Sequence, residues 1–230
     1  MYVPLEFQTI DLIAFIFFCA IWIGFETLPF RTRWKTRSIT YHIEKHRQEW
    51  MKNIMRRELQ PVDGILQTTL QQSIGFFAST SILAIGGLFA ALGAADKAIA
   101  MLGDFPLTVP TTQAQWEFKV MLLILTFVFA FFKFVWSIRL FSYVAILIGA
   151  APVFSDDEKL KEEYAERLGR LHSLGARHFT TGLNAYLFAL VATTWFVSPW
   201  AFLCATVWLT LVLLRRTFNS NFAKILAGKK

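Results

Sequence analysis

Residues 12–25 read LIAFIFFCAIWIGF, a run without a single charged side chain. Arg31, Arg33, Lys35 and Arg37 follow it closely. A helix needs roughly 20 mostly apolar residues to cross the hydrocarbon core of a bilayer, and cytoplasmic loops beside such helices carry an excess of Lys and Arg. Apolar and basic runs alternate in this way along the chain. The sequence therefore predicts an all-α integral membrane protein.

Composition supports this class. Of the 230 residues, 55% are hydrophobic and only 17% are charged, whereas about a quarter of the residues of a soluble domain are charged. Helices that expose side chains to lipid explain this bias better than one large soluble core does.

We predict a single helical membrane domain over residues 1–230 with about five transmembrane helices. The predicted spans cover residues 9–28, 73–94, 118–139, 181–197 and 200–214. Ser198 and Pro199 interrupt the last apolar run, which favours a helical hairpin there. The run that begins at Phe118 stays apolar to Ala151, too long for one crossing at about 1.5 Å per residue, so part of it must project or bend.

The basic residues predict the orientation. Residues 31–58 hold nine Lys or Arg and three Glu, and five basic residues follow Leu214 without an acidic one. Such segments stay in the cytoplasm, whereas the loop at 95–116, with Asp96 and Asp104 against Lys97, suits the opposite side. Five crossings place the N-terminus outside and the C-terminus in the cytoplasm. The expected location is the bacterial inner membrane.

Two amphipathic helices are predicted in the cytoplasm, at residues 38–58 and 155–174. Ser155 and Glu158 have the spacing of a capping box at a helix start. Leu160, Leu168 and other apolar residues recur at helical spacing after it. We expect these apolar stripes to pack on the membrane domain or on a second copy of the chain.

Polar side chains in or beside the apolar runs are candidates for a solute or ion path. Lys133 lies among phenylalanines, where an unpaired charge at the bilayer centre costs about 2.5–3.5 kcal/mol. Either its long stem carries the ammonium group to the interface or into an ion pair, or the ammonium group forms an anion or substrate site. The polar residues before the second span fit a vestibule or a cytoplasmic helical extension. The channel-lining candidates are Gln67, Gln71, Ser79, Lys133, Ser137 and Arg139.

Small residues recur in the second predicted span and allow another helix to approach closely. Either they serve packing within one subunit, or they form the seam of a homo-oligomer or a pore wall. The helix-packing candidates are Gly75, Gly86, Gly87 and Ala90.

No residue pattern indicates catalysis. His42 and His46 are four apart, but the intervening HIEKH sequence differs from the zinc-peptidase pattern and no third ligand is recognisable. A glycine-rich phosphate loop, a nucleophile elbow and a thiol pair are also missing from the sequence. We expect no enzyme activity, no metal and no cofactor. The basic segment at 31–57 directly follows a span, which favours anionic lipid headgroups over nucleic acid as its partner.

Three stretches resemble the uncharacterised membrane family known as domain of unknown function 599 (DUF599), found in bacteria and plants. They are DGILQTTLQQSIGFFASTSILAIGGLFAAL from Asp63, FKVMLLILTFVFAFFKFVWSIRLFSYVAILIGAAP from Phe118, and GARHFTTGL from Gly175. In the second stretch, Ser137, Ile138 and Arg139 precede an apolar run to Pro152, as in the family. The resemblance implies a polytopic helical fold and supplies no activity, because none is established for the family.

The sequence is therefore compatible with three functions. The leading hypothesis is a self-associating, non-enzymatic scaffold or lipid-contacting protein. The alternative is an oligomeric channel or transporter for an ion or small solute. A second alternative is an accessory subunit of a membrane enzyme complex.

Overall fold

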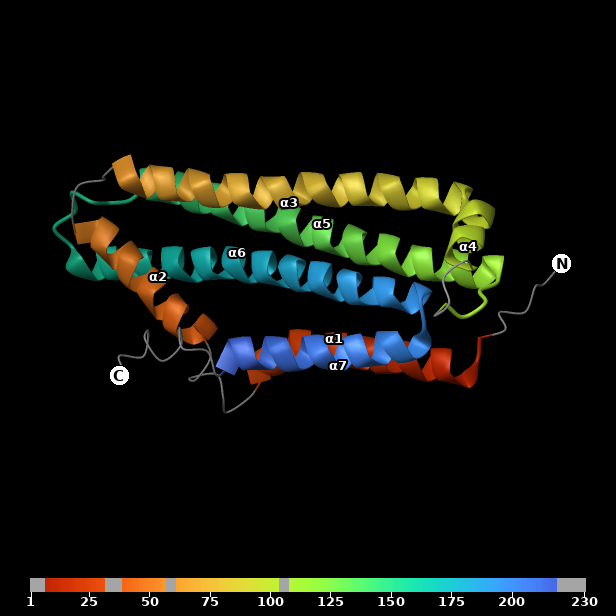
Figure 1. Ribbon diagram of the computed structural model, residues 1–230. Helices are drawn as coiled ribbons and strands as arrows, with labels where there is room; N and C mark the ends of the chain where they lie inside the picture. Colours follow the sequence, from red (N-terminus) through yellow and green to blue (C-terminus); the bar gives the residue numbers. More distant parts are fainter. Residues whose placement is uncertain (1–6, 32–38, 57–60, 104–107, 219–230) are drawn as a thin grey trace. The chain divides into compact units, whose positions relative to one another are not determined.

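The computed structural model describes residues 7–31, 39–56, 61–103 and 108–218, with backbone alone at 28–31 and 218. The chain forms α1 (Thr9–Arg31), α2 (Ile39–Arg56), α3 (Pro61–Gly93), α4 (Ala95–Gly103), α5 (Gln113–Gly149), α6 (Glu158–Thr193), the 3₁₀ turn η2 (Thr194–Phe196) and α7 (Pro199–Phe218) (Figure 1). No strand occurs among the described residues, and the predicted all-α class is confirmed. Most of the basic residues at 31–37, and all of those after residue 218, were used to predict the orientation and lie outside the described residues.

Four of the described helices are long and apolar enough to cross a membrane. They are the segments Thr9–Thr27, Pro61–Gly93, Gln113–Gly149 and Pro199–Thr217. The predicted span at 181–197 is not among them. Instead, α6 joins this segment and the predicted cytoplasmic helix at 155–174 into one helix, because no proline separates them. The apolar run does break before Pro199, which opens α7 at the first-turn position that proline favours.

The helices divide into two compact units. Of the described residues, unit 1 contains 7–31, 80–103, 108–130 and 183–216, and unit 2 contains 39–56, 61–79, 131–182 and 217–218. The helices α3, α5 and α6 each contribute one part to both units.

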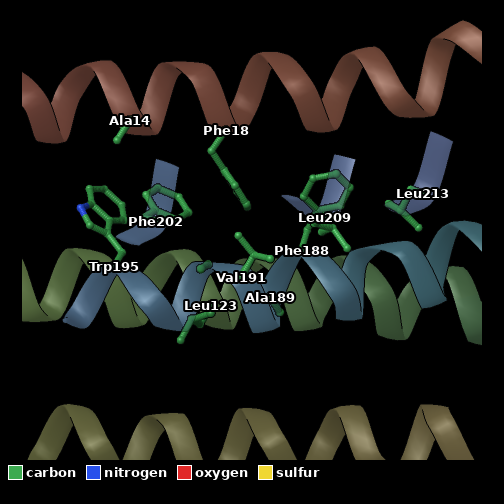
Figure 2. Packing of buried hydrophobic residues seen from close by; sticks show 11 residues of the cluster. Ala14, Phe18, Leu123, Phe188, Ala189, Val191, Trp195, Phe202, Leu209 and Leu213 are labelled. Carbon is green, nitrogen blue, oxygen red and sulfur yellow. The ribbon is translucent and has the colours of Figure 1, made fainter. Parts of the chain in front are cut away.

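The core of unit 1 is built from aromatic and aliphatic side chains of α1, α5, α6, η2 and α7. In Figure 2, Ala14 and Phe18 point from α1 toward Trp195 and Phe202. The Trp195 and Phe202 rings stack with centroids 5.0 Å apart, and Phe18 meets Phe202 at the same distance. These contacts hold α1 and α7 side by side within unit 1 (Figure 1).

The core of unit 2 lies where α2 meets α5 and α6. Met51, Ile54 and Met55 of α2 pack with Val144 of α5 and Leu168 of α6. Burial of each such side chain is worth about 1.5–3 kcal/mol, which explains how the otherwise polar α2 is held in place.

Charged pairs line the edge of this α2–α6 contact. Lys52 donates a hydrogen bond to Glu162 over 2.7 Å, and Arg177 donates to Glu44 over 3.3 Å. These side chains remain partly exposed, so each pair adds less than about 1 kcal/mol and mainly fixes the register of the two helices.

A glycine allows a close contact between α6 and α5 in unit 2. A Cβ atom at Gly182 of α6 would lie 2.5 Å from Cε1 of Phe134. The ring of Phe134 is buried and stacks on Phe77 of α3 with centroids 5.8 Å apart. The ring therefore has little room to move away, and only glycine fits at position 182 without displacing it.

Candidate functional site

Two of the six predicted channel-lining residues take part in helix packing. Gln67 and Ser137 are buried in unit 2, where each donates one hydrogen bond to the backbone of a neighbouring helix: Gln67 to the carbonyl of Phe141 at 2.8 Å, and Ser137 to that of Gly175 at 2.7 Å. Gln71 is half-buried, and Ser79 and Arg139 are exposed. Gln67 and Ser137 thus form hydrogen bonds that link packed helices.

Lys133 is half-buried on α5. Burial and then the charges of Lys133 and Arg177 lower the pKa of His178 on α6, which places the three basic groups near one another in unit 2. Neither of the two hollows described below is lined by Lys133 or by the other five candidates.

The glycines predicted for helix packing take no part in close contacts within the described chain. A Cβ atom added at Gly75, Gly86 or Gly87 would meet no atom within 4 Å. Gly86, Gly87 and Ala90 are exposed on α3. This face of α3 is therefore open to lipid or to another protein.

A polar cavity of about 170 Å³ lies in unit 1, at the end where α1, α5 and α7 begin. The segment 109–112 and the η2 turn form part of its lining. Its lining residues are Gln8, Asp11, Val109, Pro110, Thr111, Thr112, Gln115, Lys119, Trp195, Phe196, Val197 and Pro199.

Hydrogen bonds fix the wall made by α5. The backbone N–H of Thr112 donates to Oε1 of Gln115 at 3.1 Å, and the N–H of Gln115 donates to Oγ1 of Thr112 at 3.3 Å. This reciprocal pair is a capping box, which fixes the start of α5 and satisfies two backbone N–H groups there. A further backbone bond, from Val109 N–H to the Val197 carbonyl at 3.2 Å, ties the loop to the opposite wall.

Two opposite charges line the cavity, and both are bonded to Trp195. The indole Nε1–H of Trp195 donates to Oδ1 of Asp11 at 2.7 Å, and Nζ of Lys119 donates to the backbone carbonyl of Trp195 at 3.0 Å. Asp11 is 6% exposed and Lys119 is 5% exposed. Charged groups this deeply buried are rare in membrane helices, and when present they usually mark a binding or transport site.

Aromatic rings surround this pair of charges. Lys119 Nζ lies 5.4 Å from the centre of the Trp195 ring and 6.0 Å from that of Phe196. Phe15 stacks on Trp195 with centroids 5.8 Å apart. The rings exclude water from one side of the charges, and electrostatic attraction acts more strongly in such a medium than in water.

Most residues of this site were not predicted from the sequence. Lys119 and Trp195 lie in the predicted spans 118–139 and 181–197, and neither was among the predicted site residues. Two signals were present: the Thr112–Gln115 capping-box spacing, and Lys119 four residues after Gln115, hence on the same helix face. The meeting of these residues with Asp11 was not predictable, because it depends on how three helix ends pack.

A wider, open hollow of about 530 Å³ runs along α2. His46, Glu49, Trp50, Asn53 and Arg56 line it. The side chains of His46 and Glu49 are mostly exposed, so water screens the interaction between them. Among the described residues, no three His, Cys, Asp or Glu side chains are grouped closely enough to hold a metal ion. The cavity of unit 1 is therefore the stronger candidate site.

Comparison with known proteins places the chain in a family. The family described as "Protein of unknown function, DUF599" matches residues 13–222, which include Lys119 and Trp195. No curated protein and no solved structure was found to match the chain. The match spans most of the sequence and agrees with the resemblance of its three quoted stretches. The chain belongs to the DUF599 family of membrane proteins of unknown function.

Proposed function

We propose that this membrane protein binds a small polar solute in the cavity of unit 1, as a transporter or channel for that solute. The observation that carries the proposal is the buried pair of opposite charges, Asp11 and Lys119, on the wall of one cavity. Burying a charge in a membrane protein costs several kcal/mol. An apolar residue would fill the same position without this cost, so packing alone does not explain why charged residues stand there.

The dimensions of the cavity support a small ligand. Its volume of about 170 Å³ exceeds the roughly 30 Å³ that one water molecule occupies in the liquid. It falls short of the roughly 300–1,000 Å³ of pockets that hold drug-sized ligands. The proposed role needs no catalytic group, in line with the expectation that the protein is not an enzyme.

A thermal-stability screen tests this proposal. The purified full-length protein in detergent is heated with millimolar small solutes of four classes: neutral, anionic, cationic and zwitterionic. A solute that binds only the folded protein raises the melting temperature, because it stabilises the folded state by about 2.7 kcal/mol at 100 times its Kd. We expect at least one class to raise it, and we expect Lys119→Met to abolish the effect.

Lys97→Met is the matched control for this screen. Lys97 is an exposed lysine of α4 in the same unit and does not line the cavity, so this variant should keep the response of the wild type. A screen in which no class of solute changes the melting temperature of the wild type would reject the proposed function. Equal responses in the two lysine variants would reject the cavity as the site.

Self-association through α3 is a second candidate function, consistent with a scaffold. Its specific support is the exposed small-residue face at Gly86, Gly87 and Ala90, where an added Cβ at either glycine meets open space. Helices in membranes associate through such faces, because small side chains let two backbones approach closely.

Replacing Gly86 and Gly87 together by leucine should shift the protein toward monomers, since the larger side chains keep a second α3 at a distance. The particle mass in detergent, measured by light scattering after size exclusion, reports this shift. Ala100→Leu, at an exposed site on α4, should keep the wild-type mass. If the double variant has the same number of subunits as the wild type, this face of α3 is not part of the contact between subunits.

We further propose the bacterial inner membrane as the location and anionic lipid headgroups as partners of the 31–57 basic segment. The exposed Lys45 on α2 supports the lipid contact. Each Lys or Arg near an anionic surface contributes about 1 kcal/mol of attraction.

A further inference from the structure

We infer that the solute is a small zwitterion, which carries an anionic and a cationic group a few bonds apart, as in an amino acid. This inference rests on the proposed function and names its ligand class. The anionic group of the solute binds Lys119, and its cationic group binds Asp11.

The first argument is that Asp11 and Lys119 attract each other through space but do not form a close ion pair. Within the described part of the chain no ion pair joins Asp11 and Lys119, and each is bonded to a different atom of Trp195. Trp195 thus holds an ammonium group and a carboxylate apart on the wall of one cavity. Buried charges are stable when each has a partner of opposite sign and matching hydrogen bonds, and a bridging zwitterion supplies both partners.

The second argument is the remaining bonding capacity of the two groups. An ammonium group has three N–H donors, and Lys119 uses one of them for the Trp195 carbonyl. A carboxylate has two acceptor oxygens, and Oδ1 of Asp11 accepts the indole N–H. The groups that remain match a carboxylate and an ammonium group of a ligand.

The third argument excludes ligands of a single charge. An anion that binds Lys119 in this cavity is repelled by Asp11, and a cation that binds Asp11 is repelled by Lys119, because both side chains are buried where water screens charges poorly. A zwitterion avoids both repulsions. The volume of about 170 Å³ limits it to a short molecule.

The test is a calorimetric titration of the full-length protein in phosphatidylcholine nanodiscs. The probes are glycine, β-alanine and γ-aminobutyrate, which separate the two charges by increasing lengths, with propionate and propylamine as singly charged controls. We expect one zwitterion to bind at least tenfold more tightly than either control. Because this comparison uses the unmodified protein, it does not depend on the folding of a variant.

Two variants then assign the contacts. Lys119→Met and Asp11→Asn should each weaken binding of the preferred zwitterion at least tenfold, whereas Lys97→Met and Asp96→Asn, at exposed sites on α4, should leave it unchanged. If Lys119→Met does not fold, Lys119→Arg takes its place. This variant keeps the positive charge and should retain part of the affinity for the zwitterion.

The outcomes separate the two proposals. Binding of propionate or propylamine as tight as that of every zwitterion, and lost in Lys119→Met, would overturn the zwitterion inference and leave the solute site intact. Binding of a neutral solute and of no charged one would likewise overturn the zwitterion inference and leave the solute site intact. Failure of all three zwitterions to bind would overturn the inference, and failure of every class in the thermal screen would also overturn the proposed function.

Discussion

Replacing Trp195 by alanine should lower the free energy of unfolding of the detergent-solubilised protein by about 3–5 kcal/mol, the range for removal of a large aromatic side chain from a core. Trp195 is 1% exposed and stacks on Phe15 and Phe202. The surrounding helices cannot fill the space of an indole, so a cavity remains. The substitution also removes the N–H that donates to the buried carboxylate of Asp11.

Unfolding in increasing SDS, followed by circular dichroism, measures this loss. Trp208→Ala is the matched control, because Trp208 on α7 is 68% exposed and is not part of the buried core of unit 1. We expect the control to cost less than about 1 kcal/mol, in the range usual for surface substitutions. Equal losses in the two variants would contradict the assignment of Trp195 as the centre of the unit 1 core and of the cavity wall.

Acidification should destabilise unit 2 through His172. This side chain is 2% exposed, makes edge-to-face contacts with the rings of Trp50 and Phe141, and has no hydrogen-bond partner for either ring nitrogen among the described residues. Burial, and after it the charge of Arg47, lower the pKa of His172 from 6.5 to about 4. The folded protein therefore holds this histidine neutral where the unfolded chain would protonate it.

The direction of the pH effect follows from this difference in proton binding. Above about pH 6.5 neither state is protonated at His172 and its contribution to stability is complete. As the pH falls toward 4, the unfolded chain binds a proton that the folded protein does not, and stability falls by about 1.4 kcal/mol per pH unit, up to about 3 kcal/mol. Below pH 4 this contribution stays constant.

Unfolding curves at pH 7 and at pH 4.5, compared with those of His172→Phe, isolate this contribution. The variant should lose most of the pH-dependent decline, whatever its stability at pH 7. His46→Phe, which changes a mostly exposed histidine of α2, should keep the decline because His172 remains. A decline of the same size in His172→Phe and in the wild type would assign the pH dependence to other groups.

The sequence was a good guide to the helices and a poor one to the polar residues that matter. Apolar runs and Pro199 predicted the membrane class and the break before α7. Gln67 and Ser137 attracted attention because they are polar in apolar surroundings, yet each makes one bond between packed helices. Lys119 was not predicted as a site residue, because a lysine near the start of a membrane helix is expected at the interface. Only its burial in the structure shows otherwise.

The amino-acid sequence by itself determined that this chain is a helical membrane protein of the DUF599 family, since hydrophobic length and charge are properties of consecutive residues. Only the tertiary structure decided which charges are buried and what they meet. Asp11, Lys119 and Trp195 come from helices far apart in the chain, and their contact depends on how the helix ends pack. The same holds for the open face of α3, because a glycine that seats a neighbouring helix and one that faces open space look alike in sequence.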